Sequence, residues 1–374
     1  MSWESIVGQD RVKKVIRAAL HAGRIPHAYL FYGPEGVGKD AMAIELAKVV
    51  NCQGGDDVSC GECDSCLKFN SLQHPNLKLV FALPIGKGEK AGDPPLSKIS
   101  TEDLESVREQ IRLKAVNRYH KIGVPRAITI KVNSIRQLKR ESSLTAYGKG
   151  KKVIIVLDAE NMNDESSNAL LKTLEEPTKD TLLVLTTSQR DRLLPTIVSR
   201  CQGIRFDFLT ENAIAKSLER QRGIAPAQAM LVGRLAHGNM SRAFELLETD
   251  LQAQRSEVLE FLRTIYGDDG IALSKFVEKI GQDYASDREG LIQFFQVLQF
   301  WLRDAFCIRE GFASIINIDQ SESIERFARK FSRLNYPALL ERLDSVISLV
   351  NKNAYIPLVV MVLSLEIRKL LSEA

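Results

Sequence analysis

Residues 33–40, GPEGVGKD, combine residue types and a spacing that can bind phosphate groups. In the pattern G-x-x-x-x-G-K the glycines let main-chain N–H groups point at phosphate oxygens, and Lys39 neutralises the phosphate charge. The glycines concerned are Gly33, Gly36 and Gly38. The next residue is Asp40, where a Ser or Thr normally meets Mg²⁺. Either Asp40 ligates the ion in an unusual way, or the position has relaxed because no hydrolysis is needed.

A second acidic position lies at the end of the apolar run in IIVLDAENM. In P-loop ATPases an Asp here helps to hold Mg²⁺, and a Glu directly after it activates the attacking water. Asp158 fits the first role, whereas Ala159 stands in the place of the second. Glu160 comes one residue late, and neighbouring side chains of an extended chain face opposite ways. Asp40 and Ala159 are therefore two independent departures that argue against efficient ATP hydrolysis.

Four cysteines are spaced C-x7-C-x2-C-x2-C, at Cys52, Cys60, Cys63 and Cys66. Four thiolates at such a spacing suit a tetrahedral structural Zn²⁺ site, which leaves no open position for a catalytic water. Free thiols and disulfides are the alternatives. The remaining two cysteines, Cys201 and Cys307, are expected to be unliganded.

These candidate sites need strands and helices to position them. The run HAYLFYG predicts a buried strand leading into the glycine-rich loop, and KDAMAIELAKVVNC predicts the helix after it. The apolar runs 152–159 and 181–188 are typical of parallel strands covered on both faces, and DESSNALLKTLEEP between them predicts a helix. Residues 1–207 are therefore expected to form an α/β domain with a parallel sheet. Beyond about residue 208 only helical patterns are found.

The composition is that of an ordinary globular chain, with 26% charged and 44% apolar residues among 374. The longest apolar run, 356–365, is too short to span a bilayer, and the N-terminus has no basic stretch followed by an apolar one. A cytoplasmic location with reduced thiols is therefore expected. Residues 78–152 carry 17 Lys or Arg against 7 Asp or Glu, so the basic character of a chain whose net charge is +4 is concentrated there.

Five segments occur in an order that resembles a known family: VGQDRV, GRIPHAYLFYGPEGVGKD, the cysteine cluster opening with NC, NALLKTLEEP and SRCQ. They are similar to segments of the bacterial DNA polymerase III clamp-loader subunits, the gamma/tau and delta-prime group of AAA+ proteins. The resemblance covers residues 1 to about 210, and the helical remainder agrees in length and character. LLKTLEEP and SRC together make the resemblance specific.

The resemblance implies three parts. They are an AAA+ P-loop domain over 1–207 with a zinc module at 52–66, a small helical lid over 208–255, and a helical collar over 256–374 that joins a ring of subunits. The ring would contain gamma/tau and delta subunits, would be driven by ATP in gamma/tau, and would load a sliding clamp onto primed DNA as part of the DNA polymerase III holoenzyme. The place of action would be the nucleoid-associated replisome in the cytoplasm, away from membranes.

The resemblance also assigns roles to single residues. Arg200, in SRC, corresponds to an arginine finger that reaches a neighbouring subunit's ATP site in trans, and a purely structural arginine is the alternative. Thr187 corresponds to the sensor-1 group near the γ-phosphate. Arg242 corresponds to sensor 2 on the lid, and without nucleotide it is a relic or pairs with an acidic neighbour. Val7 and Gly8 match the segment that borders the adenine pocket.

Positions 40 and 159 decide between the branches of this family. Gamma/tau subunits keep a Thr after the Lys and a Glu after the Asp and commonly run longer. Asp40, Ala159 and the length of 374 residues therefore resemble the delta-prime branch, which scaffolds the ring and hydrolyses no ATP. An active motor subunit with Asp40 on Mg²⁺ and Glu160 as base is the alternative, and a zinc-bearing DNA-binding module is a third. Whether the loop still binds ATP or ADP is left open.

The chain carries about 40 residues more than the family pattern between HPNLKLV and ITIKVNSIRQLKRE. This insertion, at about 80–128, includes the basic amphipathic text LESVREQIRLKAVNRYHKIG, which could contact DNA phosphates or a partner subunit. A solvated helix face is the favoured interpretation, because Glu residues interleave with the Arg and Lys residues.

Overall fold

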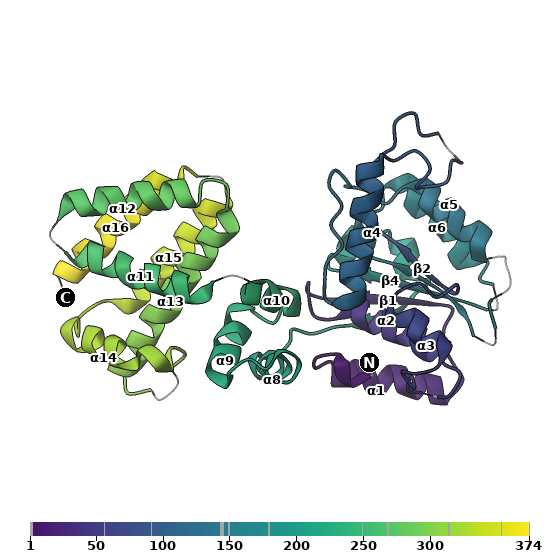
Figure 1. Cartoon of the computed structure of the whole chain (residues 1–374), viewed down its shortest axis with the longest axis horizontal. Coiled ribbons are helices and arrows are strands. Elements are labelled where there is room, and N and C mark those ends of the chain that lie inside the picture. Colours follow the sequence, from purple (N-terminus) through teal and green to yellow (C-terminus); the bar gives the residue numbers. More distant parts are fainter. Residues whose placement is uncertain are drawn as a thin grey trace. The chain divides into compact units, whose positions relative to one another are not determined.

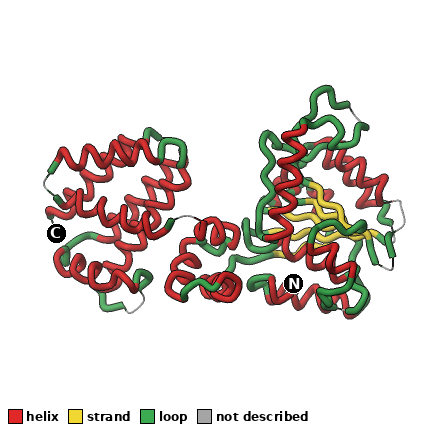
Figure 2. Tube along the Cα trace, viewed as in Figure 1, coloured by secondary structure: helices red, strands yellow, loops and turns green. Residues whose placement is uncertain are grey.

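The computed structural model describes residues 3–55, 57–90, 92–142, 146–148, 150–178, 180–248, 250–267, 269–312, 315–352 and 354–373. The chain divides into two compact units, Met1–Ile214 with His237–Arg242 and Ala215–Ala236 with Ala243–Ala374. Figure 1 follows the sequence through both units, and Figure 2 distinguishes their helices and strands. The three-part division with boundaries at 207 and 255 stays a prediction. Among the described residues, none of the helices combines the length and the apolarity needed to cross a bilayer.

The first unit is built around a five-stranded sheet in which all neighbouring strands are parallel. The strands are β1 (Ala28–Tyr32), β2 (Leu77–Val80), β3 (Lys152–Val156), β4 (Thr181–Thr187) and β5 (Gln202–Arg205). Their spatial order is β2-β3-β4-β1-β5, so β1 lies between β4 and β5. The predicted α/β domain with a parallel sheet is therefore confirmed. Because the strands are parallel, the loops after β1, β3 and β4 emerge at one edge of the sheet.

Helices connect these strands. The helices of the first unit are α1 (Asp10–His21), α2 (Lys39–Val49), α3 (Asp64–Asn70), α4 (Thr101–Val116), α5 (Val132–Ser142), α6 (Asp164–Glu175) and α7 (Pro195–Val198), with 3-10 turns η1 (Trp3–Ser5), η2 (Ala159–Asn161) and η3 (Arg190–Arg192). Of these, α4 lies within the predicted insertion at about 80–128.

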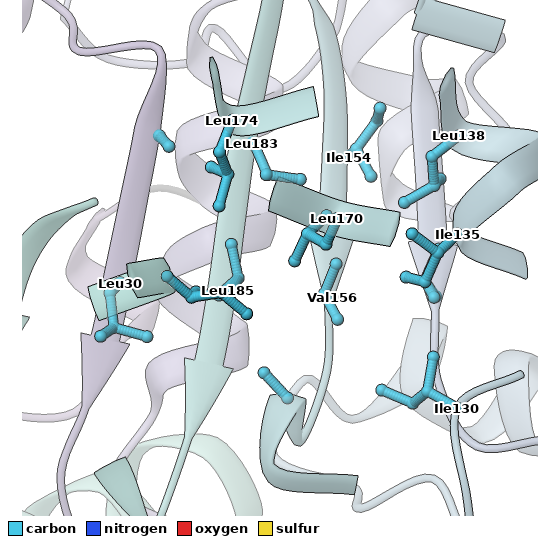
Figure 3. Packing of buried hydrophobic residues seen from close by; sticks show 14 of the residues in the cluster. Leu30, Ile130, Ile135, Leu138, Ile154, Val156, Leu170, Leu174, Leu183 and Leu185 are labelled. Atoms are coloured by element: carbon cyan, nitrogen blue, oxygen red, sulfur yellow. The ribbon is translucent and has the colours of Figure 1, made fainter. Parts of the chain in front are cut away.

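Both faces of the sheet are covered. On one face, strand side chains pack against α5, α6 and α7, because successive residues of a strand point to opposite faces. Figure 3 shows this core, with Leu30, Ile154, Val156, Leu183 and Leu185 from the strands and Ile135, Leu138, Leu170 and Leu174 from the helices. On the other face α2 packs against β3 and β4, and every residue of α2 except Asp40 is buried. This burial fixes the helix that follows the glycine-rich loop.

Strand β3 is shorter than the predicted run 152–159 and ends at Val156. Two residues later Asp158 adopts a left-handed conformation with φ of 48°, and the chain turns into η2. Glu160 therefore lies on a turn and not on an extended strand. The alternation of side chains along a strand does not apply to Glu160, so its position has to be judged from its contacts.

After residue 208 the described residues form helices and no strand, as predicted. They are α8 (Glu211–Arg222), α9 (Pro226–Leu235), α10 (Met240–Glu248), α11 (Leu251–Tyr266), α12 (Gly270–Asp283), α13 (Arg288–Arg309), η4 (Ile318–Gln320), α14 (Ser321–Lys330), α15 (Tyr336–Asn351) and α16 (Ile356–Ser372). In the second unit α13 packs against α11, α14 and α15, and α12 packs against α16. Apolar residues recur along these helices on the buried faces, which is the pattern of an all-α bundle.

Candidate functional site

The four predicted zinc ligands come together between α2 and α3. Their Sγ atoms all lie within 4.8 Å of one another, and all four thiols are free. The Sγ atoms of Cys60 and Cys66 are 3.9 Å apart, close to the ~3.8 Å edge of a tetrahedron with metal–sulfur bonds of about 2.3 Å. Main-chain N–H groups of Cys60, Cys63 and Cys66 point at the neighbouring thiols at 3.2–3.4 Å. The donor set therefore fits a tetrahedral metal ion.

The glycine-rich loop leads from β1 into α2, as predicted. Gly38 has φ of 99°, a conformation that other residues adopt only under strain, and it directly precedes α2. Lys39 is buried, and its Nζ atom donates to the main-chain oxygens of Gly33 at 2.9 Å and Pro34 at 2.5 Å. Burial lowers the pKa of Lys39, although nearby carboxylates oppose this effect. The lysine that should meet phosphate is thus bound by its own loop.

Asp40 is held by two partners that sequence reasoning did not identify. Its Oδ2 atom accepts from Lys114 Nζ at 2.5 Å, and its Oδ1 atom accepts from Thr186 Oγ1 at 2.8 Å. The side chain of Lys114 is 1% exposed and that of Asp40 is 25% exposed. Burial raises the pKa of Asp40, but the Lys114 ammonium and the two hydrogen bonds outweigh it and hold the pKa below its ordinary value. Asp40 is therefore an ionised carboxylate that is already paired.

Asp158 and Glu160 lie close to Asp40 but differ in their surroundings. Burial and the nearby Asp40 charge raise the pKa of Asp158 to about 6. Glu160 Oε1 accepts from the main-chain N–H of Ser188 at 2.9 Å and from Ser188 Oγ at 2.6 Å. Ala159 is fully buried. The carboxylate that could activate water is therefore bound to the end of β4, and the position before it carries only a methyl group.

Thr187, the predicted sensor-1 residue, is fully buried at the end of β4. Its Oγ1 atom accepts from the main-chain N–H of Gln189 at 3.0 Å. The neighbouring Thr186, and not Thr187, is the residue that reaches Asp40. Thr187 is therefore beside the site, and its hydroxyl is bound by the segment between β4 and η3.

The predicted adenine and sensor-2 segments also approach the loop. The main-chain N–H of Met240 donates to Gly36 O at 2.9 Å, and a Cβ added to Gly36 would overlap the Asn239 side chain. Arg242 is the third residue of α10, and its main-chain N–H donates to Asn239 Oδ1 at 3.0 Å. Val7 is buried, and its N–H donates to Tyr119 Oη at 2.8 Å. Gly8, the other predicted residue of this segment, directly follows Val7, with φ of 56°.

The arrangement does not fit MgATP as it stands. The residue at the magnesium position is paired with a buried ammonium group, and a tyrosine from the insertion lies against Val7 and Gly38. A cavity of about 220 Å³ borders Asp40 and Asp158, and the insertion forms one of its walls through Lys121, Ile122, Gly123, Val124 and Ala127. The carboxylates of Asp40 and Asp158 border this cavity and would repel the negative charges of a polyphosphate.

Arg200 lies just after α7 and is exposed. Its Nη2 atom is 2.9 Å from Glu175 Oε1 of α6, and its Nη1 atom donates to Thr196 O at 3.1 Å. Both partners are on the surface, and the exposed fractions of the Arg200 and Glu175 side chains are 37% and 49%. The guanidinium group is thus oriented at the surface by two contacts, neither of which belongs to the glycine-rich loop.

Sequence reasoning missed Lys114, Tyr119 and Thr186. One signal was available, because a carboxylate in a buried phosphate loop requires a cation, and the insertion carries nine Lys or Arg residues. The spacing of the sequence could not select Lys114 among them. The insertion is also more than a solvated helix face, because Lys114 and Val107 of α4 are buried while Arg112 is exposed and pairs with Glu109.

The comparisons with known proteins agree with this architecture. Residues 8–210, more than half of the chain, match the family described as DNA polymerase III, delta subunit. The chain is 30% identical over 331 residues to DNA polymerase III subunit delta' of Bacillus subtilis strain 168, covering 88% of this chain and 87% of that protein. It is 32% identical over 241 residues to subunit delta' of Pseudomonas aeruginosa PAO1, covering 64% and 61%. It is 27% identical over 252 residues to subunit tau of Bacillus subtilis, covering 66% and 37%. The chain therefore belongs to the clamp-loader AAA+ family of DNA polymerase III, as a delta-prime-type subunit.

Proposed function

We propose that the chain is a non-hydrolysing scaffold of the clamp loader that completes the ATP site of a neighbouring subunit. The observation that carries this proposal is the pair of residues after β3. Ala159 places a buried methyl group at the position of the catalytic base, and the carboxylate of Glu160 is bound by Ser188. Both hydrogen bonds, at 2.6–2.9 Å, are accepted by Glu160 Oε1 and orient the carboxylate toward the residue after β4, while its other oxygen, Oε2, is buried and has no hydrogen-bond partner in the described part of the chain.

Arg200 is the residue through which the chain would act on its neighbour. An arginine finger must be exposed before assembly and oriented toward the partner, and Arg200 is exposed and held by Glu175. Exchange of the Glu175 carboxylate for a γ-phosphate would replace an exposed ion pair with a desolvated one at small initial cost, because exposed pairs contribute only about 0–1 kcal/mol. In related phosphoryl-transfer sites such an arginine accelerates hydrolysis by about 10³–10⁵-fold.

The partners in this proposal are gamma/tau and delta clamp-loader subunits, with the sliding clamp and primed DNA reached through the assembled complex in the cytoplasm. The four-cysteine cluster holds a structural Zn²⁺ ion, which joins the end of α2 to the start of α3. Cys63 supports this role because it caps the N-terminus of α3, where its Sγ atom accepts from the N–H of Cys66. Hydrogen bonds from the N–H groups of Cys63 and Glu62 lower the pKa of Cys60 to about 6, which favours the thiolate at this position, whereas burial raises the pKa of Cys66.

Clamp loading tests the proposal. The complex is reconstituted with and without this chain, and loading of a labelled clamp onto primed DNA is followed by fluorescence. We expect loading to require the chain and to survive Lys39→Ala, because the loop of this chain performs no hydrolysis. Loss of loading with Lys39→Ala, together with ATPase activity of the isolated chain, would instead support an active motor subunit. Salt-sensitive binding of primed DNA by the isolated chain would support the DNA-binding alternative.

A further inference from the structure

The insertion ends directly on the glycine-rich loop. Helix α4 runs to Val116, and the segment that follows it passes the start of α2, where Figure 1 shows α4 ending beside α2. Within this segment, residues 114–121 contact the loop at three points, which are Asp40, Gly38 and Glu35. Residues further along the insertion, including Ile122 and Ala127, line the cavity beside Asp40.

Lys114 is the partner of Asp40, the residue at the position of the phosphate-loop pattern where a Ser or Thr normally meets Mg²⁺. Its ammonium group bonds Asp40 Oδ2 at 2.5 Å and His120 O at 2.7 Å, and the side chain is buried almost completely. Its charge also counteracts the rise in the pKa of Asp158. A buried ammonium that pairs with one carboxylate and stabilises a second one performs the electrostatic task of a metal ion.

Tyr119 fills the path between the adenine segment and the phosphate loop. Its Oη atom accepts from Val7 N–H at 2.8 Å, and the residue is buried. A Cβ on Gly38 would lie 3.1 Å from Tyr119 Oη and 3.2 Å from Cε1, so the ring rests against the backbone of the loop. A nucleotide that reached from Val7 to Gly38 would have to displace this ring.

The segment is fastened at both ends. Arg118 donates to the main-chain oxygens of Phe69 at 3.0 Å and Asn70 at 2.8 Å, which are the last residues of α3. Ser241 Oγ donates to Tyr119 O at 2.5 Å. Lys121 pairs with Glu35 of the loop. Because these anchors come from three different parts of the first unit, the segment is held across the loop and is not a loose tail.

We propose that residues 114–121 are a built-in plug that occupies the nucleotide cradle of this chain, with Lys114 in place of the metal ion and Tyr119 in place of the nucleoside path. The plug rests on the proposed non-hydrolysing function and gives a physical reason for it, because it prevents the nucleotide binding that hydrolysis requires. The plug does not include Arg200, so the plug and the proposed action of Arg200 on a neighbouring subunit can be refuted separately. Opening the plug adds a conformational cost to binding, which lowers the apparent affinity in proportion to the open fraction.

Equilibrium binding of fluorescent ADP and ATP with Mg²⁺ to the isolated full-length chain tests the plug. We expect no saturable binding by the wild-type chain. The triple variant Asp40→Thr, Lys114→Met and Tyr119→Ala restores a hydroxyl at position 40 and removes both plug side chains, and we expect it to gain saturable binding of the nucleotide. Addition of Lys39→Ala to this variant should abolish the gain. Arg112→Met, an exposed change on the same helix, should leave binding as in the wild type.

Two results would overturn the plug. One is saturable binding of MgATP by the wild-type chain, and the other is a folded triple variant that fails to bind. Folding is checked by zinc content and by the fluorescence of buried Trp3. If the triple variant does not fold, hydrogen–deuterium exchange of the wild-type chain at millimolar MgATP decides. Unchanged exchange in residues 33–40 and 114–121 supports the plug, and protection of the loop or release of the segment refutes it.

Discussion

Removal of the Lys114 ammonium should destabilise the first unit more than removal of any exposed charge on α4. Lys114→Met keeps the length and helix propensity of the side chain but leaves Asp40 ionised without its partner. Breaking a buried ion pair by removing one member costs about 3–5 kcal/mol. Because the Asp40 side chain is 25% exposed and keeps its bond to Thr186, we expect the lower end, about 3 kcal/mol.

Urea unfolding measures this cost in the first unit alone. The chain has two tryptophans, Trp3 in the first unit and Trp301 in the second, so Trp301→Phe leaves a single reporter of the first unit. Separate reporters are needed because a chain of several domains need not unfold in one step. Arg112→Met is the matched control, because Arg112 makes an exposed pair with Glu109 worth about 0–1 kcal/mol.

The pH dependence of unfolding tests the Asp40–Lys114 pair independently. The pKa of Asp40 is depressed in the folded state, so the stability from its pairing is present above the unfolded value of 3.8 and is lost as the pH falls below it. The difference between wild type and Lys114→Met should therefore be largest near neutral pH and should shrink below pH 3.8. A cost for Lys114→Met no larger than that for Arg112→Met at pH 7 would refute the view that Lys114 is a buried counter-ion.

Three further outcomes follow from the contacts. Purified chain should contain one Zn²⁺, and Cys63→Ser should lose the ion and expose residues 52–70 to limited proteolysis; a metal-free chain that resists proteolysis equally well would contradict this. Asp158→Asn should stabilise the first unit at pH 8 by up to about 3 kcal/mol and should leave its stability unchanged below pH 3.8. The reason is that the pKa of Asp158 is raised to about 6 in the folded state, so the wild-type chain loses stability as the pH rises from 3.8 toward 6 and the carboxyl group ionises. Urea unfolding at both pH values measures the effect, and equal effects at the two pH values would contradict this prediction. Asp304→Ala should lower the free energy of unfolding of the second unit by about 3 kcal/mol, because the fully buried carboxylate accepts from Ile316 N, Asn317 N and Asn317 Nδ2. The control Asp344→Ala, an exposed change, should lower it by less than about 1 kcal/mol. Trp301 fluorescence in a Trp3→Phe chain measures both values.

The sequence was sufficient to predict the parallel sheet, the glycine-rich loop between a strand and a helix, and the cluster of four cysteines. Buried parallel strands read as continuous apolar runs, and the glycine, lysine and cysteine spacings are fixed by short loops. The predicted end of β3 lies too far along the chain, because the left-handed turn that follows the strand is at Asp158 and not at a glycine, the residue that usually indicates such a turn. The partner of Asp40 is 74 residues away in the sequence, so a pair such as Lys114 and Asp40 follows only from the tertiary fold.

The role of the insertion was the largest departure from expectation. The alternation of Glu with Arg and Lys predicts a solvated helix, and it describes the face of α4 that carries Arg112 correctly. The charge alternation does not predict the burial of Lys114. This side chain can be buried because its ammonium group donates hydrogen bonds to the Asp40 carboxylate and to the main-chain oxygen of His120. Charge patterns along one helix carry no information about the surface on which that helix packs.

The rate of ATP hydrolysis by the reconstituted clamp loader tests most directly whether this chain contributes chemistry in trans and none of its own. Complexes are compared that contain the wild-type chain, Arg200→Ala or Lys39→Ala, with primed DNA and clamp present. We predict that Arg200→Ala lowers the rate while complex assembly is retained, and that Lys39→Ala leaves the rate unchanged. A normal rate with Arg200→Ala and a reduced rate with Lys39→Ala would contradict the proposed function.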